Sequence, residues 1–243
     1  MPKGFIEIDG VPMVERSVQK LIAAGIEEII IGTGHCSEYY DELAEKYHII
    51  KTVRNDNYMN TSSMGTLEVC VPYIKGDFLL LESDLVYDSV GLKVLQNEQR
   101  PNVILASGKS NSHDEVYLAA DDDGILYEVS KNKEIIPNPS GELVGITRIS
   151  KSCLDKMMAY YKSDKSLIKL DYESALKQVS ISGEPVFVHK VEYYAWTEID
   201  DESMLDRALN QIYPRIKENE ELQNIRREVL LNPGPATTTD SVK

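Results

Sequence analysis

Hydrophobic and polar positions follow two different periods along the first half of the chain. Short apolar runs such as "GFIEI", "EEIIIG" and "HIIKTV" are typical of strands, and the stretches between them, "PMVERSVQKLIAAG" and "SEYYDELAEKY", have helical spacing. In the first helical stretch Val14, Val18, Leu21 and Ile22 share one face, while Pro12 suits its start and Gly25 its end. The pattern predicts alternating strands and helices.

The alternation continues with a long segment, residues 64–74, that leads into "GDFLLLESD". A helical stretch, "DSVGLKVLQNEQ", and an apolar run, "NVILAS", follow it. Residues 78–81 are apolar at consecutive positions, as is typical of a strand covered on both faces of a parallel sheet. We therefore expect an α/β fold with a Rossmann-like, mixed and mostly parallel sheet flanked by helices.

The pattern changes near residue 113. The stretch "DEVYLAADDDGILYEVSK" reads as a hairpin that turns at Asp122, Asp123 and Gly124, and the strand "ELVGITRI" follows. This predicts a small β-rich insertion packed against the sheet. Two helices, "KSCLDKMMAYYK" and "DYESALKQV", two strands, "PVFVHK" and "AWTEI", and a closing helix from about Glu202 complete the pattern.

The last residues, "LNPGPATTTDSVK", show no apolar period, and their proline, glycine and threonine content disfavours a helix. We therefore expect one folded domain over residues 1–225 and a separate segment, a linker or the start of something further, over residues 226–243. The 243-residue length is sufficient for one sizeable core.

Charge and composition narrow the range of partners. Lysine and arginine number 26 against 40 aspartates and glutamates, so the net charge is −14, and such a surface repels nucleic acid and anionic membranes. Small anionic substrates stay open, because a few lysines and a divalent cation can form a positive pocket in an acidic protein.

Cysteine usage and hydropathy indicate the compartment. The three cysteines are far apart in the sequence, which favours neither a disulfide framework nor a zinc site. No apolar run approaches the length of about 18 residues that a membrane span needs, and no signal peptide pattern opens the chain. We expect a cytoplasmic protein without a membrane span.

Carboxylates follow two of the expected strands. Asp84 ends "LLLESD", while Asp200 and Asp201 end "AWTEIDD". Ligands bind beyond the carboxyl ends of strands in open α/β sheets, and Mg²⁺ takes oxygen ligands such as carboxylates and phosphates. The alternative is that each aspartate only caps the helix after it.

The order of these features carries a family resemblance. The opening "MPKGFIEIDGVPMVERSVQKLIAAGIEEIIIGTGH" resembles the start of the nucleotidyltransferases that activate sugars and small alcohols as nucleoside diphosphates, and "NTSSMGTL" is similar to their base-reading stretch. The resemblance covers most of residues 2–210 in order. Asp84 and Asp200 match the two metal-binding positions of the family, which favours a Mg²⁺ site over the capping role.

The resemblance also implies roles for other residues. Lys3 would contact the nucleoside triphosphate, Asn60 and Ser62 would lie at the base and ribose, and the backbone of Gly65 and Thr66 would approach the base. A residue without Cβ permits such an approach, and an amide side chain can both donate and accept hydrogen bonds.

One part of the family pattern is not in the sequence. The family carries a strand and a Gly-rich G-x-G-x-R loop before the Pro-Lys pair, and here Pro2 follows Met1 directly. We expect this strand and loop to be missing upstream, because a sheet without its central strand would leave backbone groups of its neighbours unpaired.

The "YYAWTEIDD" ending resembles the cytidylyltransferases that act on choline phosphate and related amino-alcohol head groups. Their acceptor has a phosphoryl or phosphonyl group at one end and a cationic nitrogen at the other, which calls for a lysine and for carboxylates or aromatic faces. Lysines suited to the first role are Lys131 and Lys133, and candidates for the second are Glu173, Tyr172, Tyr193, Tyr194 and Trp196.

The final stretch adds a second resemblance. "LLNPGPATTTDSVK" is similar to the opening of the pyridoxal-phosphate-dependent 2-aminoethylphosphonate–pyruvate transaminases. The two resemblances together imply a Mg²⁺-dependent enzyme that transfers CMP from CTP to the phosphonate oxygen of 2-aminoethylphosphonate and is fused to a transaminase domain. Two alternatives stay open: a choline-phosphate cytidylyltransferase, and a degenerate nucleotide-binding domain without catalysis.

Overall fold

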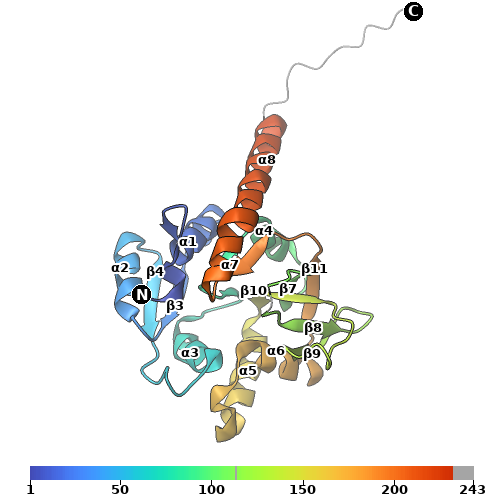
Figure 1. Ribbon diagram of the computed structural model, residues 1–243. Coiled ribbons are helices and arrows are strands. Elements are labelled where there is room, and N and C mark those ends of the chain that lie inside the picture. Colours follow the sequence, from blue (N-terminus) through green and yellow to red (C-terminus); the bar gives the residue numbers. More distant parts are fainter. Residues whose placement is uncertain (113, 232–243) are drawn as a thin grey trace, which may run out of the picture.

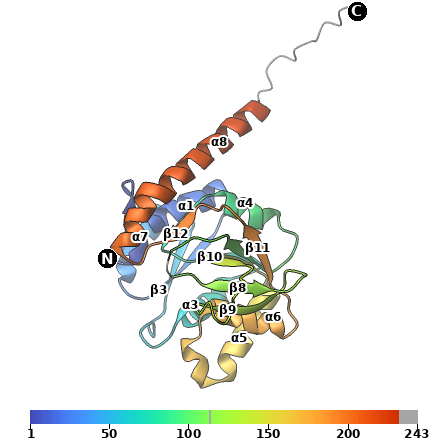
Figure 2. The same ribbon diagram turned by 45° about the vertical axis from the view of Figure 1, so that its right-hand side comes forward.

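The computed structural model describes residues 1–112 and 114–231 (Figure 1). Helices flank a mixed sheet, as the sequence pattern predicts, and the last helix runs away from the body of the molecule in both views (Figures 1 and 2). The segment that resembles the start of a transaminase falls at residues 230–243, so nearly all of it lies outside the described residues.

The helices follow the apolar periodicity closely. Gly25, with φ of 83°, ends the first helical stretch as its position suggests. None of the helices in the described part of the chain is long and apolar enough to cross a membrane. The α-helices are α1 (Met13–Ala23), α2 (Ser37–Lys46), α3 (Ser63–Cys70), α4 (Val90–Asn97), α5 (Lys151–Ser163), α6 (Tyr172–Ile181), α7 (Glu202–Arg207) and α8 (Tyr213–Leu231).

The prediction of one strand over "GFIEI" is wrong in part. Lys3–Phe5 form a 3-10 turn, and two two-residue strands follow, β1 (Glu7–Ile8) and β2 (Val11–Pro12). Asp9 and Gly10 both have positive φ, 55° and 74°, which is the geometry of a two-residue hairpin turn. The Asp-Gly pair outweighs the apolar run in deciding the local structure.

The remaining strands form a mixed arrangement. β3 pairs with β4 in parallel, β7 pairs with β11 in parallel, and β10 is antiparallel to its neighbours. These strands are β3 (Ile29–Thr33), β4 (Ile50–Arg54), β5 (Phe78–Leu81), β6 (Leu85–Tyr87), β7 (Val103–Ser107), β8 (Tyr117–Ala120), β9 (Leu126–Ser130), β10 (Gly141–Ile149), β11 (Phe187–Val191) and β12 (Trp196–Glu198).

Strand β10 connects the expected insertion to the sheet. One edge of β10 pairs with β7, while its other edge pairs with β8 at Gly141 and Glu142 and with β5 from Ile146 to Ile149. The hairpin β8–β9 therefore extends the sheet along the same edge of β10 as β5. Helix α6 packs against β9 of this hairpin (Figure 2). Leu126 of the hairpin, Met157 of α5 and Leu176 of α6 belong to one fully buried apolar cluster.

A long cavity separates two of the strands. In the described part of the chain β3 pairs only with β4, and β5 pairs only with β10. A cavity of about 870 Å³ runs along both β3 and β5, covered by apolar side chains of α1 and α3. Lys75 Nζ lies 3.4 Å from Glu28 Oε2 just before the two strands begin, so β3 and β5 start at the same edge and run in one direction.

Backbone exchange should reflect this cavity. We expect amides of β3 and β5 that face the cavity to exchange with solvent deuterium faster than amides of β7, because β7 is paired on both sides by β10 and β11. Hydrogen exchange resolved by residue is the measurement. Equal protection in the three strands would contradict the open pairing.

Candidate active site

Asp84 lies where strand β5 ends. The next element is the strand β6, not a helix, so Asp84 does not cap a helix. Its carboxylate lines the 870 Å³ cavity. Burial raises the pKa of Asp84, the charge of Asp200 adds to this effect, and the charge of Lys3 opposes it. Asp84, Asp200 and Lys3 are therefore close enough to interact electrostatically.

The two adjacent aspartates after β12 have different roles. Asp201 is the N-cap of α7, and its Oδ1 accepts a hydrogen bond from the backbone N–H of Met204 at 2.8 Å. Asp200 accepts a hydrogen bond from Lys3 Nζ instead. Of the two, Asp200 is thus the carboxylate that is directed to the site.

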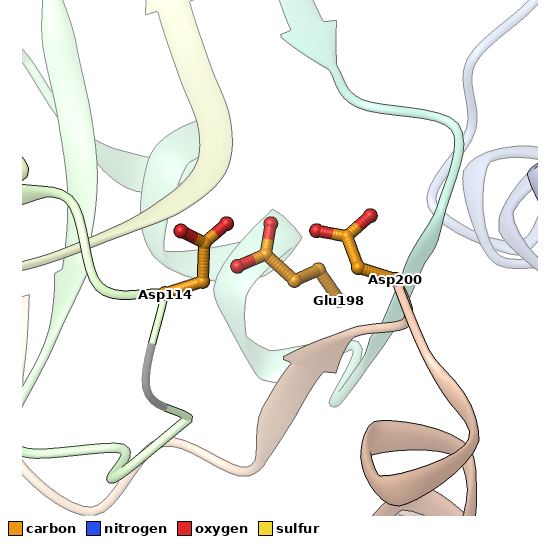
Figure 3. A group of neighbouring side chains, drawn as sticks. All are labelled: Asp114, Glu198 and Asp200. Atoms are coloured by element: carbon orange, nitrogen blue, oxygen red, sulfur yellow. The ribbon is translucent and has the colours of Figure 1, made fainter.

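Three carboxylates gather beside this point. Asp114, Glu198 and Asp200 each offer an oxygen within 4.8 Å of the other two, and Figure 3 shows their carboxylates facing one another. An all-oxygen donor set of this kind fits Mg²⁺, whose ligands lie at about 2.1 Å, after small side-chain adjustments. The structure thus places Asp114 and Glu198 beside Asp200, while Asp84 lies outside the tight group.

Two lysines face these acids. Lys131 Nζ lies 2.7 and 2.8 Å from the two carboxylate oxygens of Asp114, and Lys3 pairs with Asp200. The hydrogen bond that Lys131 donates to Asp114 raises the pKa of Lys131, and the hydrogen bond that Lys3 donates to Asp200 raises the pKa of Lys3. Both ammonium groups therefore stay charged and lie next to the carboxylates that could hold a metal.

Further carboxylates lie in the cavity wall. Burial raises the pKa of Glu82, of Glu173 and of Glu198 to about 7 in each case, because it disfavours the charged form. Glu82 Oε1 accepts a hydrogen bond from the hydroxyl of Tyr172 at 2.7 Å. Gly145, with φ of 82°, makes room for this carboxyl group, because a Cβ there would lie 2.9 Å from its carbon and one of its oxygens.

Sequence reasoning missed Glu82, Asp114 and Glu198. Glu82 precedes Asp84 by two residues, and Glu198 precedes Asp200 by two. Because side chains two residues apart in a strand point to the same face of the sheet, each glutamate would be expected on the same face as its aspartate. That signal could have been read from the sequence. Asp114 lies in a loop, and no local sequence pattern predicts that it belongs to the site.

The residues expected at the acceptor divide into two groups. Lys131, Glu173, Tyr172 and Trp196 all line the cavity. The structure does not bring Tyr193 there, because it lies at a second cavity with 81% of its surface exposed.

The other two residues considered for the acceptor also lie elsewhere. Tyr194 is buried, and its hydroxyl donates to the carbonyl of Asp88 at 2.6 Å. Lys133 is exposed, and its Nζ lies 5.7 Å from the ring centre of Tyr117. Both positions serve local packing rather than the cavity.

The expected base-reading stretch lies at the start of α3. Thr66 lines the cavity, whereas Asn60 is exposed and donates to Asn57 Oδ1 at 2.8 Å. Gly65 is buried against the side chain of Thr61, so its missing Cβ serves this contact in the absence of ligand.

Ser62 of the same stretch is held from another element. It hydrogen-bonds to Asp171, the residue directly before α6. The loop is therefore tied to the segment before α6, where Asp171 also lines the cavity.

The chain is similar to several proteins of named activity. No protein-family model matches the chain. Two curated relatives act on phosphonates by name: a 2-aminoethylphosphonate cytidylyltransferase of Lancefieldella rimae, 30% identical over 86 residues, and a CMP-5'-(3-aminopropyl)phosphonate synthase of Streptomyces rubellomurinus, 25% identical over 128 residues. The matches cover 35% and 51% of this chain, and 35% and 20% of the relatives.

Wider matches cover most of the chain. The choline-phosphate cytidylyltransferase of Streptococcus pneumoniae is 21% identical over 204 residues, which are 82% of this chain and 84% of the relative. Among solved structures, the inositol-1-phosphate CTP transferase of T. maritima has a TM-score of 0.76 at 17% identity and covers 90% of this chain and 88% of its own. The CTP:phosphocholine cytidylyltransferase of Streptococcus pneumoniae has a TM-score of 0.70 at 19% identity, with coverages of 85% and 88%.

The chain shares the fold of these two CTP transferases. In this fold, Lys3, Asp84 and Asp200 lie together although nearly 200 residues separate the first from the last. The chain spans only about a third or less of the length of the two phosphonate relatives, so their substrates bear on its activity as a proposal.

Replacement of the buried Glu173 should change the pH dependence of stability. Its pKa in the folded state is about 7 against 4.5 for an ordinary glutamate, so folding favours its protonated form and stability falls as pH rises from about 4.5 to 7. Glu173→Gln should remove this loss of stability. Relative to the wild type, its free energy of unfolding should therefore be higher at pH 8 than at pH 5 by about 2 kcal/mol. Urea unfolding at both pH values measures it.

The control for this experiment is Glu134→Gln, which removes an exposed carboxylate. It should leave the pH dependence as in the wild type. An unchanged dependence in Glu173→Gln would show that burial does not raise this pKa.

Proposed function

We propose that this chain is a nucleotidyltransferase that moves CMP from CTP to the phosphonate oxygen of 2-aminoethylphosphonate, giving CMP-2-aminoethylphosphonate and pyrophosphate. One observation carries the proposal: Lys3, Asp84 and Asp200 interact at the end of a cavity that also holds Lys131 and several carboxylates. The named activities of the similar proteins, cytidylyl transfer to phosphonates and to choline phosphate, support it.

The reaction needs positioning and charge neutralisation rather than a general base. The phosphonate oxygen is already ionised at neutral pH, so the chain need not remove a proton from it. Lys3 and Lys131 offset the negative charge that develops around the α-phosphorus of the nucleotide. Mg²⁺, when bound by Asp200 with Asp84 or with Asp114 and Glu198, supplies Lewis-acid neutralisation of phosphate oxygens.

Lysine and metal share one carboxylate in this proposal. Lys3 pairs with Asp200 in the structure without ligands. If Asp200 held a divalent cation, Lys3 would be attracted to it less strongly and its ammonium would be available to the triphosphate. The same reasoning applies to Lys131, which Asp114 holds. The two ion pairs thus keep the lysines near their places of action.

The acceptor end of the cavity favours a primary ammonium group. Glu82, Glu173 and Glu198 can each accept a hydrogen bond from such a group, which a trimethylammonium cannot donate. The aromatic residues there are already committed, since Tyr172 donates to Glu82 and Trp196 is only 6% exposed. A cage of free aromatic faces, which a quaternary ammonium prefers, is not offered by these two rings.

Choline phosphate is the second candidate acceptor. The observation in its favour is the coverage of the comparisons, because the choline-phosphate relative matches 82% of this chain and the 2-aminoethylphosphonate relative 35%. The C-terminal resemblance to 2-aminoethylphosphonate–pyruvate transaminases supports the phosphonate instead, and with it a fusion of the two enzymes.

The cavity between β3 and β5 supports a further part of the proposal. Both strands have an unpaired edge along it and run in one direction, so it suits one more strand parallel to both. Such a strand would end beside Asp84, where a Gly-rich loop could bind phosphates. We attribute this strand to a segment ahead of Met1, and its presence should slow the exchange expected at β3 and β5.

The pair of adjacent aspartates provides a matched test of the site. Asp200→Asn should lower pyrophosphate release from CTP and 2-aminoethylphosphonate by at least about 100-fold, because a group that stabilises transition-state charge contributes several kcal/mol. Asp201→Asn should stay within a few-fold of the wild type, because asparagine caps a helix as well as aspartate does.

Metal binding gives the same pair a readout apart from turnover. Mn²⁺ titration followed by electron paramagnetic resonance should show at least about tenfold weaker binding in Asp200→Asn than in Asp201→Asn. Equal Mn²⁺ affinity and equal turnover in the two variants would contradict the assignment. Metal and CTP binding without any turnover of the wild type would favour the non-catalytic alternative.

The acceptor is tested by competition between head groups. With CTP and Mg²⁺, kcat/KM for 2-aminoethylphosphonate should exceed that for phosphocholine by about tenfold or more, because trimethylammonium leaves buried carboxylates without hydrogen bonds. Glu173→Gln should reduce this ratio of kcat/KM values. A coupled assay for pyrophosphate release measures kcat/KM for each acceptor in the wild type and in the variant. A preference for phosphocholine would transfer the assignment to the second candidate.

A further inference from the structure

A second cavity lies apart from the carboxylate cluster. Its volume is about 360 Å³, and it lies between the loop after β7, the turn between β11 and β12, and the helical segment that follows α7. Trp196 contributes to the walls of both cavities. The polar lining of the second cavity includes Lys109, Ser110, Glu192, Arg207, Gln211 and Arg215.

The charge of this cavity opposes that of the protein. The chain carries a net charge of −14, yet three cations, Lys109, Arg207 and Arg215, meet a single carboxylate here. That carboxylate, Glu192, lies 2.7 Å from Lys190 and is therefore already paired. Among the side chains of residues 1–112 and 114–224, none of the three cations forms an ion pair with a carboxylate.

The two arginines are held in place by neutral partners. Arg207 donates to Thr197 Oγ1 at 3.2 Å and to the carbonyl of Ser110 at 2.6 Å, and Arg215 donates to the carbonyl of Tyr193 at 2.6 Å. These bonds orient the guanidinium groups without neutralising them. Each group keeps other N–H donors for a ligand.

We infer that this second cavity is a binding site for a small anion of the phosphate class, separate from the nucleotide site. Guanidinium groups bind phosphate oxygens through pairs of parallel N–H bonds, and an oriented guanidinium loses little entropy on binding. Three unneutralised cations in one concave site suit a dianion. Inorganic phosphate, pyrophosphate and phosphonates share this chemistry.

The position of the site connects it to the active site. The loop that supplies Lys109 and Ser110 continues to Asp114, which holds Lys131 in the first cavity. Thr197, the partner of Arg207, directly precedes Glu198 of the carboxylate cluster. An anion bound between Lys109 and Arg207 therefore contacts the two segments that carry Asp114 and Glu198. Its binding should change the mobility of these segments.

Direct binding of inorganic phosphate and of pyrophosphate tests the site. Calorimetric titration without CTP or metal should show binding to the wild-type chain, and Lys109→Gln combined with Arg215→Gln should weaken it by about tenfold or more, because two charge-assisted contacts are lost. Affinity should also fall with added salt, since both side chains are exposed. Comparison of the two anions shows which one fits better.

Two control variants assign the binding to this cavity. Lys165→Gln removes one positive charge from an exposed position outside both cavities, and this variant should bind the anions as the wild type does. Lys3→Gln removes a cation of the active site, and should leave the phosphate titration unchanged. Unfolding midpoints of all variants show whether they are folded.

Three results would overturn the inference. They are no binding of either anion to the wild type at millimolar concentration, equal binding by the double variant at Lys109 and Arg215, and loss of binding in Lys3→Gln alone. The last result would place the anion in the active site. None of these measurements depends on the identity of the acceptor, so failure here leaves the proposed reaction untouched.

Discussion

Repulsion between carboxylates is the constraint around which the site is built. Asp114, Glu198 and Asp200 bring their oxygens within 4.8 Å of one another, and like charges at such distances oppose folding. Lys3 and Lys131 offset this repulsion, while burial shifts Glu198 toward its protonated form. The divalent cation of the proposed function would therefore sit at a place where the fold already needs positive charge.

The scaffold holds these groups through strand ends rather than through a single loop. Asp84 follows β5, Glu198 ends β12, and Lys131 follows β9. Strand ends are fixed by the ladders behind them, so their side chains have little freedom to separate in response to repulsion. Asp201 contributes indirectly, because its cap on α7 fixes the backbone that presents Asp200.

The sequence predicts the architecture and part of the site for identifiable reasons. Helical periods such as that of α1 and consecutive apolar runs such as that of β5 are local, so alternation and order can be read directly. The hairpin at Asp9 and Gly10 was missed because an apolar run was weighed above its turn signal. Asp114 could not be found, because its place depends on long-range packing of a loop, and the exposure of Tyr193 is a tertiary property of the same kind.

Strand β10 has a consequence for how such a protein could change its acceptor. It shares ladders with β5 and β7 along most of its length, but pairs with the hairpin β8–β9 over a short stretch, from Ser140 to Leu143. The hairpin delivers Lys131, whereas Asp84 and Asp200 depend on other strands. Under the proposed function, insertions or deletions in the hairpin could therefore alter the segment that carries Lys131 while the strand ends that carry Asp84 and Asp200 stay unchanged, which would make substrate range a separable module of this fold.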